Sequence, residues 1–140
     1  MAWAADREPV KVKYVIDGDT LILADNTRLR LIGLDAPEMG REGRADKPWA
    51  RAARQRLADL AGGRMVELEL DEERRDRHGR LLGYLFGQGR LINEVILEEG
   101  LARVFIVGPS TRYAERLVAA ERRARAEGRG LWADWPGRWP

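Results

Sequence analysis

A chain of 140 residues has the length of one ordinary domain, and 44% hydrophobic residues suffice for a packed core. The absence of cysteine excludes disulfides and thiolate zinc sites, and a single histidine excludes catalysis by a histidine pair. A formal net charge of +2 is far below the surplus of a protein that coats nucleic acid, and no apolar run approaches the ~20 residues of a membrane span.

The first part of the chain has the pattern of a three-stranded antiparallel meander. Residues 10–14 alternate between apolar side chains and lysines, which predicts a half-buried strand with Tyr14 on its inner face. Asp-Gly at 17–18 predicts a tight turn into an apolar strand. Asp-Asn at 25–26 predicts a second turn, which leads into a strand over 27–34.

A polar loop and a helix come next. Residues 38–47 are polar and contain glycine, which predicts an exposed loop. Pro48 is suited to the start of a helix, and apolar residues recur after it at helical spacing. Trp49 is expected to pack this helix against the sheet, and Gly-Gly at 62–63 ends it.

The remaining chain alternates strands with helices. Period-two patterns and β-branched residues predict the strands, and apolar spacing of three and four predicts the helices. In chain order these elements cover residues 65–70, 81–86, 91–99, 104–107 and 113–127. Short antiparallel strands with few residues between them favour a closed barrel with helices packed on one side, an α+β fold. Without a repeat or a linker, we expect one domain over 1–140, with its core at about 10–133 and short tails.

Carboxylates flank the first turns of the predicted meander. Asp17 and Asp19 lie in IDGDT, and Asp35 and Glu38 lie in LDAPE. Hard divalent cations prefer several oxygen ligands from rigid turns. Taken alone, IDGDT is more typical of a hairpin turn with solvated aspartates, and LDAPE of a strand end that leads into a proline turn. Their occurrence together, beside strands that also carry arginine, favours a catalytic site.

Two arginine-bearing segments accompany the carboxylates. Arg30 interrupts an otherwise apolar strand, although a position on the barrel exterior beside Arg28 would also explain it. The segment 76–80, DRHGR, has the pattern of a charged turn in which Gly79 supplies a positive φ.

Together these segments resemble the staphylococcal-nuclease-like (thermonuclease) family. The resemblance runs from about Val10 to Trp132 in the family's order and spacing. The matching stretches are IDGDT at 16–20, RLIGLDAPE at 30–38, DRHGR at 76–80, INEVILEEGLA at 92–102 and GLW at 130–132.

The resemblance implies a fold and an activity. The family fold is a five-stranded OB-fold β-barrel with three α-helices, which agrees with the element order. The activity is calcium-dependent hydrolysis of DNA and/or RNA, with a preference for single strands and release of 3′-phosphates. No membrane partner is implied, and we expect a monomer.

The resemblance also assigns roles to individual residues. Asp19 and Asp35 are similar to the side-chain calcium ligands, and Ala36 stands where the family supplies a backbone carbonyl. Glu38 is similar to the general base, although a residue that only orients the water would leave the same pattern. Arg30 and Arg80 are similar to the two phosphate-contacting arginines. Asp17 is either an outer partner of the metal site or a structural turn residue.

Base-stacking tyrosines of some family members are absent here. His78 stands at the first such position and is a candidate substrate contact, as is Arg77, with an ordinary surface position as the alternative for each. Phe105 near the second position is expected in the core. The main alternative function is a non-catalytic OB-fold module that binds nucleic acid or protein, followed by a carbohydrate-binding OB domain.

One geometric expectation follows from strand periodicity. Arg30 and Asp35 are an odd number of residues apart, so a regular strand would point them to opposite faces. We therefore predict a bend near Gly33. At the N-terminus, Ala-Trp-Ala before Ala-Asp resembles the end of a signal-peptide cleavage site behind an added Met1, which is consistent with export; an ordinary terminus is the alternative.

Overall fold

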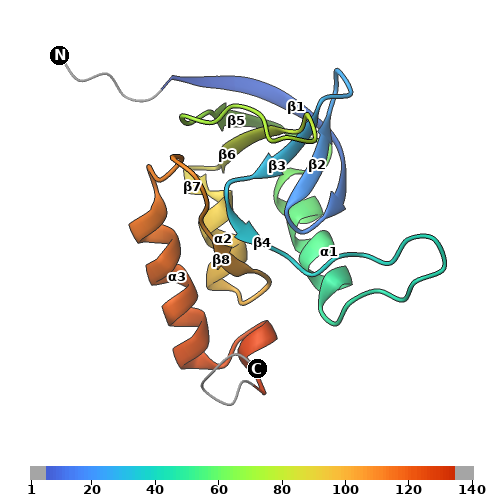
Figure 1. The fold of residues 1–140 in the computed structure, drawn as a ribbon, viewed down its shortest axis with the longest axis vertical. Coiled ribbons are helices and arrows are strands. Elements are labelled where there is room, and N and C mark those ends of the chain that lie inside the picture. Colours follow the sequence, from blue (N-terminus) through green and yellow to red (C-terminus); the bar gives the residue numbers. More distant parts are fainter. Residues whose placement is uncertain (1–5, 135–140) are drawn as a thin grey trace.

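A computed structural model describes residues 6–134 as a small barrel with helices on one side (Figure 1). The barrel sheet consists of β1 (Arg7–Asp17), β2 (Thr20–Leu23), β3 (Arg28–Leu31), β5 (Met65–Glu69), β6 (Leu81–Gly87) and β7 (Arg90–Leu91). A second, two-stranded sheet pairs β4 (Gly33–Asp35) with β8 (Arg103–Phe105). The helices are α1 (Ala50–Ala61), α2 (Ile92–Glu98), α3 (Ala114–Glu127) and the 3₁₀ turn η1 (Gly130–Trp132).

The barrel closes through one parallel strand pair. The sheet has the order β3-β2-β1-β5-β6-β7, and β3 also pairs in parallel with β6, with Leu29 opposite Leu81 and Leu31 opposite Gly83. This pairing removes the free edges of a twisted sheet. The expected α+β fold, a five-stranded OB-fold barrel with three helices, is confirmed.

The core lies inside the barrel and continues to the helices. Leu21, Leu29 and Leu85 are fully buried, and α2 buries one side against the barrel. Asn93 on α2 is also fully buried: its side chain accepts a hydrogen bond from the Leu85 N–H at 3.0 Å and donates to the Ile32 carbonyl at 2.9 Å. These bonds satisfy backbone groups of the barrel, and they fix the position of α2 against the barrel.

The expected position of Tyr14 on the inner face is wrong. Val12 pairs with Leu23 but Tyr14 pairs with Ile22, so two residues of β1 advance against one of β2. Such a bulge shifts the alternation of side chains that follows it. Val12 is buried, whereas Tyr14 is 53% exposed.

The predicted bend near Gly33 is confirmed. The strand expected over 27–34 is divided at Ile32 into β3 and β4, and Gly33 has φ 90°. Its missing side chain matters as well, because an added Cβ would collide with Cδ1 of Leu117 on α3. After the bend, β4 leaves the barrel and pairs with β8 (Figure 1).

Helix α1 begins two residues after the predicted Pro48, and Trp49 does not pack it against the barrel. Trp49 precedes the helix with φ 70°, and its side chain is 45% exposed. Because this left-handed residue lies outside the helical spacing, Ala53 and Leu57 form the buried face instead. Gly62 caps the C-terminal end, as expected.

The connection from β8 to α3 is tied to the barrel by polar contacts. Glu69 of β5 is fully buried and accepts hydrogen bonds from the Tyr113 hydroxyl at 2.9 Å and from Arg112 at 2.8 Å. The Ser110 hydroxyl accepts a bond from the Glu73 N–H. These contacts place the residues after Phe105 beside the barrel strands.

Two features complete the description of the chain. None of the helices in the described part is long and apolar enough to cross a membrane. The N-terminal segment that resembles a cleavage site lies at residues 1–5, outside the described residues.

Candidate active site

Asp19 lies at the centre of the candidate site, in the turn between β1 and β2. Its carboxylate is only 8% exposed. One oxygen accepts a hydrogen bond from the Ala36 N–H at 2.9 Å, and the other accepts from the Thr20 hydroxyl at 2.8 Å. The turn of the first hairpin is thereby joined to the end of β4, which brings together IDGDT and LDAPE.

Arg30 connects the two predicted calcium ligands. Its Nη2 lies 3.3 Å from Asp19 Oδ2 and 3.4 Å from Asp35 Oδ1, and it donates to the Leu34 carbonyl at 3.1 Å. Both carboxylates reach the same guanidinium because the chain bends at Gly33. The Arg30 side chain is 18% exposed, so the alternative of a solvated exterior position does not hold.

Two groups of this cluster, the Asp19 carboxylate and the Nε–H of Arg30, are costly to bury. Burial raises the pKa of Asp19; the charge of Arg30 and the hydrogen bonds from Ala36 and Thr20 oppose the shift, and the charge of Asp35 adds to it. Within the described residues 6–134, the buried Nε–H of Arg30 meets no hydrogen-bond acceptor, a costly arrangement. A cation beside the carboxylates would offset the cost of burying Asp19, and an anionic oxygen beside Nε would accept its hydrogen bond.

Glu38 follows these residues at the start of the 38–47 loop, with an exposed side chain. Asp17 holds the backbone beside it, because its carboxylate accepts from the Met39 N–H at 3.0 Å and from Arg41 Nη2 at 2.8 Å. The Lys47 N–H donates to the Glu38 carbonyl and closes the neck of the loop. Asp17 is therefore an anchor of the loop that carries Glu38.

Arg80 is held by its own turn. Asp76 Oδ2 accepts from Arg80 Nε at 2.6 Å, and Oδ1 accepts from the backbone N–H groups of Arg80 and His78. Burial alone would raise the pKa of Asp76, but these hydrogen bonds outweigh it and hold the pKa below its ordinary value. Gly79 has φ 81°, as predicted for this turn.

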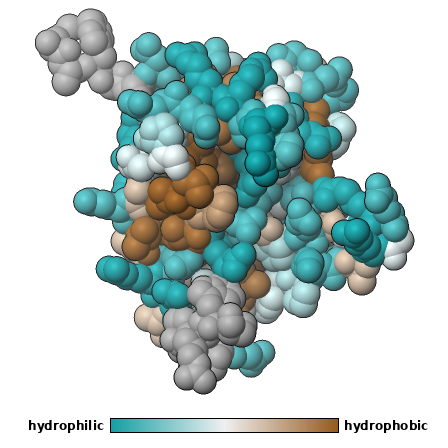
Figure 2. Space-filling view, in the orientation of Figure 1, coloured by the Kyte–Doolittle hydropathy of each residue, from teal (hydrophilic) through white to brown (hydrophobic). Residues whose placement is uncertain are grey.

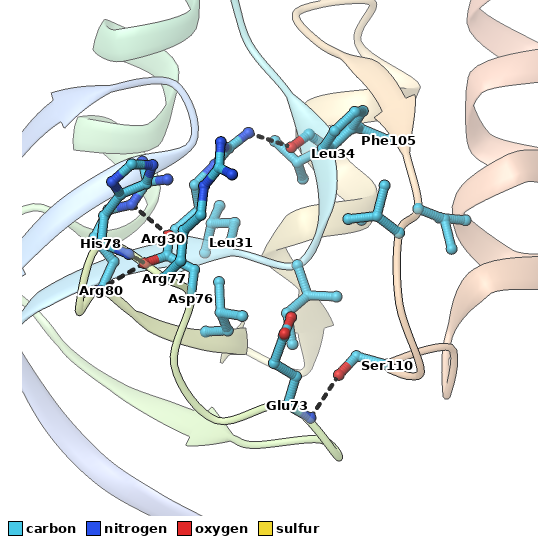
Figure 3. A pocket seen from close by; sticks show the side chains of 15 residues that line it. Arg30, Leu31, Leu34, Glu73, Asp76, Arg77, His78, Arg80, Phe105 and Ser110 are labelled. Atoms are coloured by element: carbon cyan, nitrogen blue, oxygen red, sulfur yellow. Dashed lines mark hydrogen bonds and ion pairs between the residues drawn. The ribbon is translucent and has the colours of Figure 1, made fainter.

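Arg30 and Arg80 line one cavity of about 310 Å³, although their segments are 50 residues apart in sequence. Figure 3 shows the side chains of Arg30, Arg77, His78 and Arg80 on one side of it, with Leu34 and Phe105 across from them. The predicted substrate contacts Arg77 and His78 are thus brought to the same cavity as the arginines.

The expectation that Phe105 lies in the core is wrong. Its side chain is 49% exposed, and Val107 is 59% exposed. Both line the cavity, in an apolar patch over the connection from β8 to α3 (Figure 2). The physical reason is the alternation along β8: Arg103 and Phe105 lie on its exposed face, and Val104 between them is half-buried.

The donor set suits a hard cation with few protein ligands. Among residues 6–134, no group of three or more His, Cys, Asp or Glu side chains is arranged to hold a metal ion. The candidate ligands are two carboxylates, Asp19 and Asp35, and the Ala36 carbonyl, all oxygen donors on rigid segments. Water would have to complete the coordination of a calcium ion.

Arg103 is a site residue that sequence reasoning missed. It lies opposite Asp35 in the β4–β8 pair, and its Nη2 is 3.1 Å from Asp35 Oδ2. Asp35 therefore lies between two arginines. The only sequence signal was the segment GLAR at the end of the second helix, which did not indicate its strand partner.

Comparison with known proteins identifies the family. The family model "Staphylococcal nuclease homologue" matches residues 28–134, a range that begins after Asp17 and Asp19. A "Thermonuclease" of Staphylococcus hyicus is 32% identical over 133 residues, 93% of this chain and 79% of the relative. A "Micrococcal nuclease" of Shigella flexneri is 34% identical over 145 residues, 95% and 77% respectively.

The similarity also extends to longer proteins. "Endonuclease YncB" of Bacillus subtilis (strain 168) is 32% identical over 129 residues, and the chain spans 61% of its length. The family model covers most of the chain, and the first relative is matched over most of its length. The chain therefore belongs to the staphylococcal nuclease homologue family.

Proposed function

We propose that this nuclease is a calcium-dependent phosphodiesterase that cleaves DNA and/or RNA, prefers single strands and leaves 3′-phosphates. One observation carries the proposal: Arg30 joins both candidate metal ligands and keeps a buried Nε–H without an acceptor among the described residues, at the edge of a cavity that it shares with Arg80. Strand preference and product follow from the resemblance to the family.

The arginines are suited to a phosphate that gains charge during the reaction. Attack on a phosphodiester adds negative charge to a group that is already anionic. Guanidinium groups stay protonated and can hold phosphate oxygens with two parallel hydrogen bonds. Arg30 and Arg80 come to the cavity from β3 and from the Asp76 turn, both held by ion pairs before substrate arrives. Such preorganised donors contribute the largest part of many rate enhancements.

Asp19, Asp35 and the Ala36 carbonyl would hold the calcium ion. When bound there, it would offset phosphate charge and orient the substrate. Arg30 contacts both carboxylates, so its guanidinium would lie beside a phosphate bound to the ion.

Glu38 is the proposed base. Its exposed carboxylate can accept a proton from an attacking water or orient that water. Asp17 holds the neighbouring Met39 N–H, so the main chain that carries Glu38 has a defined position. Glu38 lines the same cavity as Asp35 and Ala36, which supports this role.

Cleavage of single-stranded DNA and RNA oligonucleotides with calcium, with magnesium and with EDTA tests the proposal. We expect activity with calcium only. Glu38→Gln should lose about 10²–10⁴-fold in kcat, and Arg30→Ala about 10²–10³-fold. Glu42→Gln is the matched control, since Glu42 is an exposed glutamate of the same loop, and should keep full activity.

The controls separate the alternatives. Cleavage that persists in EDTA, or full activity in both variants, would contradict the mechanism. If the wild type never cuts but retards oligonucleotides on a gel, the protein is a binding module instead.

A further inference from the structure

A second cavity, of about 480 Å³, is lined by Asp35 and Glu38 of the candidate site. Its lining also includes two cations that have no role in the proposed mechanism, Lys47 and Arg103. The lining residues of the first cavity include neither of these cations. The carboxylates of the site thus share a cavity with two basic groups other than Arg30 and Arg80.

The tertiary structure brings Lys47 and Arg103 close to Asp35 and Glu38. The antiparallel pairing of β4 with β8 sets Arg103 opposite Asp35. The hydrogen bond from the Lys47 N–H to the Glu38 carbonyl, 3.0 Å long, returns the 38–47 loop to its starting point. Arg103 therefore comes from a strand and Lys47 from a closed loop, and neither position depends on the other.

Arg103 can exchange Asp35 for another anionic acceptor at little cost in stability. The two side chains are 47% and 37% exposed, and ion pairs of such exposure contribute little to stability. A phosphate oxygen is a competing acceptor for a guanidinium fork. Arg30 and Arg103 contact the two oxygens of the same carboxylate, so both guanidinium groups lie beside Asp35.

We propose that Arg103 and Lys47 form a subsite for the phosphodiester next to the one that is cleaved, so that the strand crosses β4 from one cavity to the other. The inference rests on the proposed function and extends it to substrate length. Asp35 and Glu38 line the same cavity and repel a free anion. The expected ligand is therefore a phosphate tethered to the scissile one, and not inorganic phosphate.

Substrate length tests the subsite. Wild type and Arg103→Gln are compared on a dinucleotide, which has one phosphodiester, and on a hexanucleotide, each at a calcium concentration that saturates the variant. We expect Arg103→Gln to raise KM for the hexanucleotide by about tenfold or more, with kcat nearly unchanged. The dinucleotide should show no such increase. Lys47→Gln should give a smaller change in the same direction.

A matched control separates this role from general charge. Arg123 on α3 is 48% exposed and lies 3.0 Å from Glu98, nearly the same exposure and pairing as Arg103. Arg123→Gln should leave both substrates unaffected. An equal loss on both substrates in Arg103→Gln would mean that Arg103 acts through Asp35 on the scissile phosphate, and would overturn the proposal.

A binding measurement keeps the inference independent of catalysis. Hexanucleotide binding to Glu38→Gln, with and without Arg103→Gln, is measured as a function of salt. Loss of one phosphate contact should reduce the slope of log K against log salt by about 0.7 for a single strand. Arg103→Lys should retain that slope because it keeps the charge. An unchanged slope in Arg103→Gln refutes the subsite, and this arm gives its result even if the wild type cuts neither substrate.

Discussion

Replacement of Gly33 by alanine should destabilise the protein and separate the two halves of the site. Gly33 has φ 90°, and an added Cβ would collide with Cδ1 of Leu117, a side chain that is 1% exposed. Two costs therefore add: a backbone conformation that L side chains rarely adopt, and a collision in the core. The bend at Gly33 also lets Arg30 contact Asp35, so relief of the strain by backbone movement would alter the site.

Gly43→Ala isolates the backbone cost. Gly43 has φ 82°, and an added Cβ there meets nothing within 4 Å. Its replacement should cost about 1–2 kcal/mol, reduced by about 0.4–1 kcal/mol through the lower entropy of the unfolded chain. At Gly33 the collision adds about 1–3 kcal/mol of overpacking. We expect a total of about 2–4 kcal/mol for Gly33→Ala.

Urea denaturation of Gly33→Ala, Leu117→Ala and the double variant measures the collision directly. Leu117→Ala alone should cost about 2–5 kcal/mol because it leaves a cavity. The double variant should be more stable than the sum of the single effects by about 1 kcal/mol or more, since the shortened side chain no longer meets the new Cβ. Strict additivity, or a Gly33→Ala effect no larger than that of Gly43→Ala, would refute the reasoning.

Three further predictions concern the core, the Asp76 turn and the cation. Asn93→Leu should lower the free energy of unfolding by about 2–4 kcal/mol in urea titrations, because the Leu85 N–H and the Ile32 carbonyl lose their buried partners. Asp76→Asn should destabilise the protein at neutral pH. The pKa of Asp76 is lowered in the folded protein, so its carboxylate stabilises the fold only while it is ionised. The melting temperatures of the wild type and of Asp76→Asn should therefore converge as the pH falls through that pKa, and a difference that stays constant would contradict this. Calcium at 100 times its Kd should stabilise the wild type by about 2.7 kcal/mol in calorimetry, and Asp19→Ala should abolish the gain.

Local sequence patterns predicted most of the elements, and the resemblance to the family predicted the composition of the site. Alternation predicted β5 and β6, helical spacing predicted α1 and α3, and the turn residues predicted both first hairpins. These features depend on neighbours in sequence, so their signal is local. The odd spacing of Arg30 and Asp35 even predicted the bend at Gly33, because strand geometry requires it.

Errors arose where an element was irregular, ended or lay outside the barrel. Tyr14 is exposed because β1 bulges against β2, and Trp49 is exposed because it precedes α1 in a left-handed conformation. Phe105 was expected in the core, but it lies on the exposed face of β8, which pairs with β4 outside the barrel sheet. The periodic spacing of residues predicts which side chains face the core only while the helix or strand stays regular.

By itself, then, the sequence determined the order of the elements, the barrel with three helices and the residues that meet around Asp19. Only the tertiary structure decided that Arg103 lies opposite Asp35, and that Arg103 and Lys47 share a second cavity with the carboxylates of the site. The physical reason is the pairing of β4 with β8, whose partners Asp35 and Arg103 are 68 residues apart. No local pattern carries that information, because the register is set by closure of the barrel and by the packing of α3 behind Gly33.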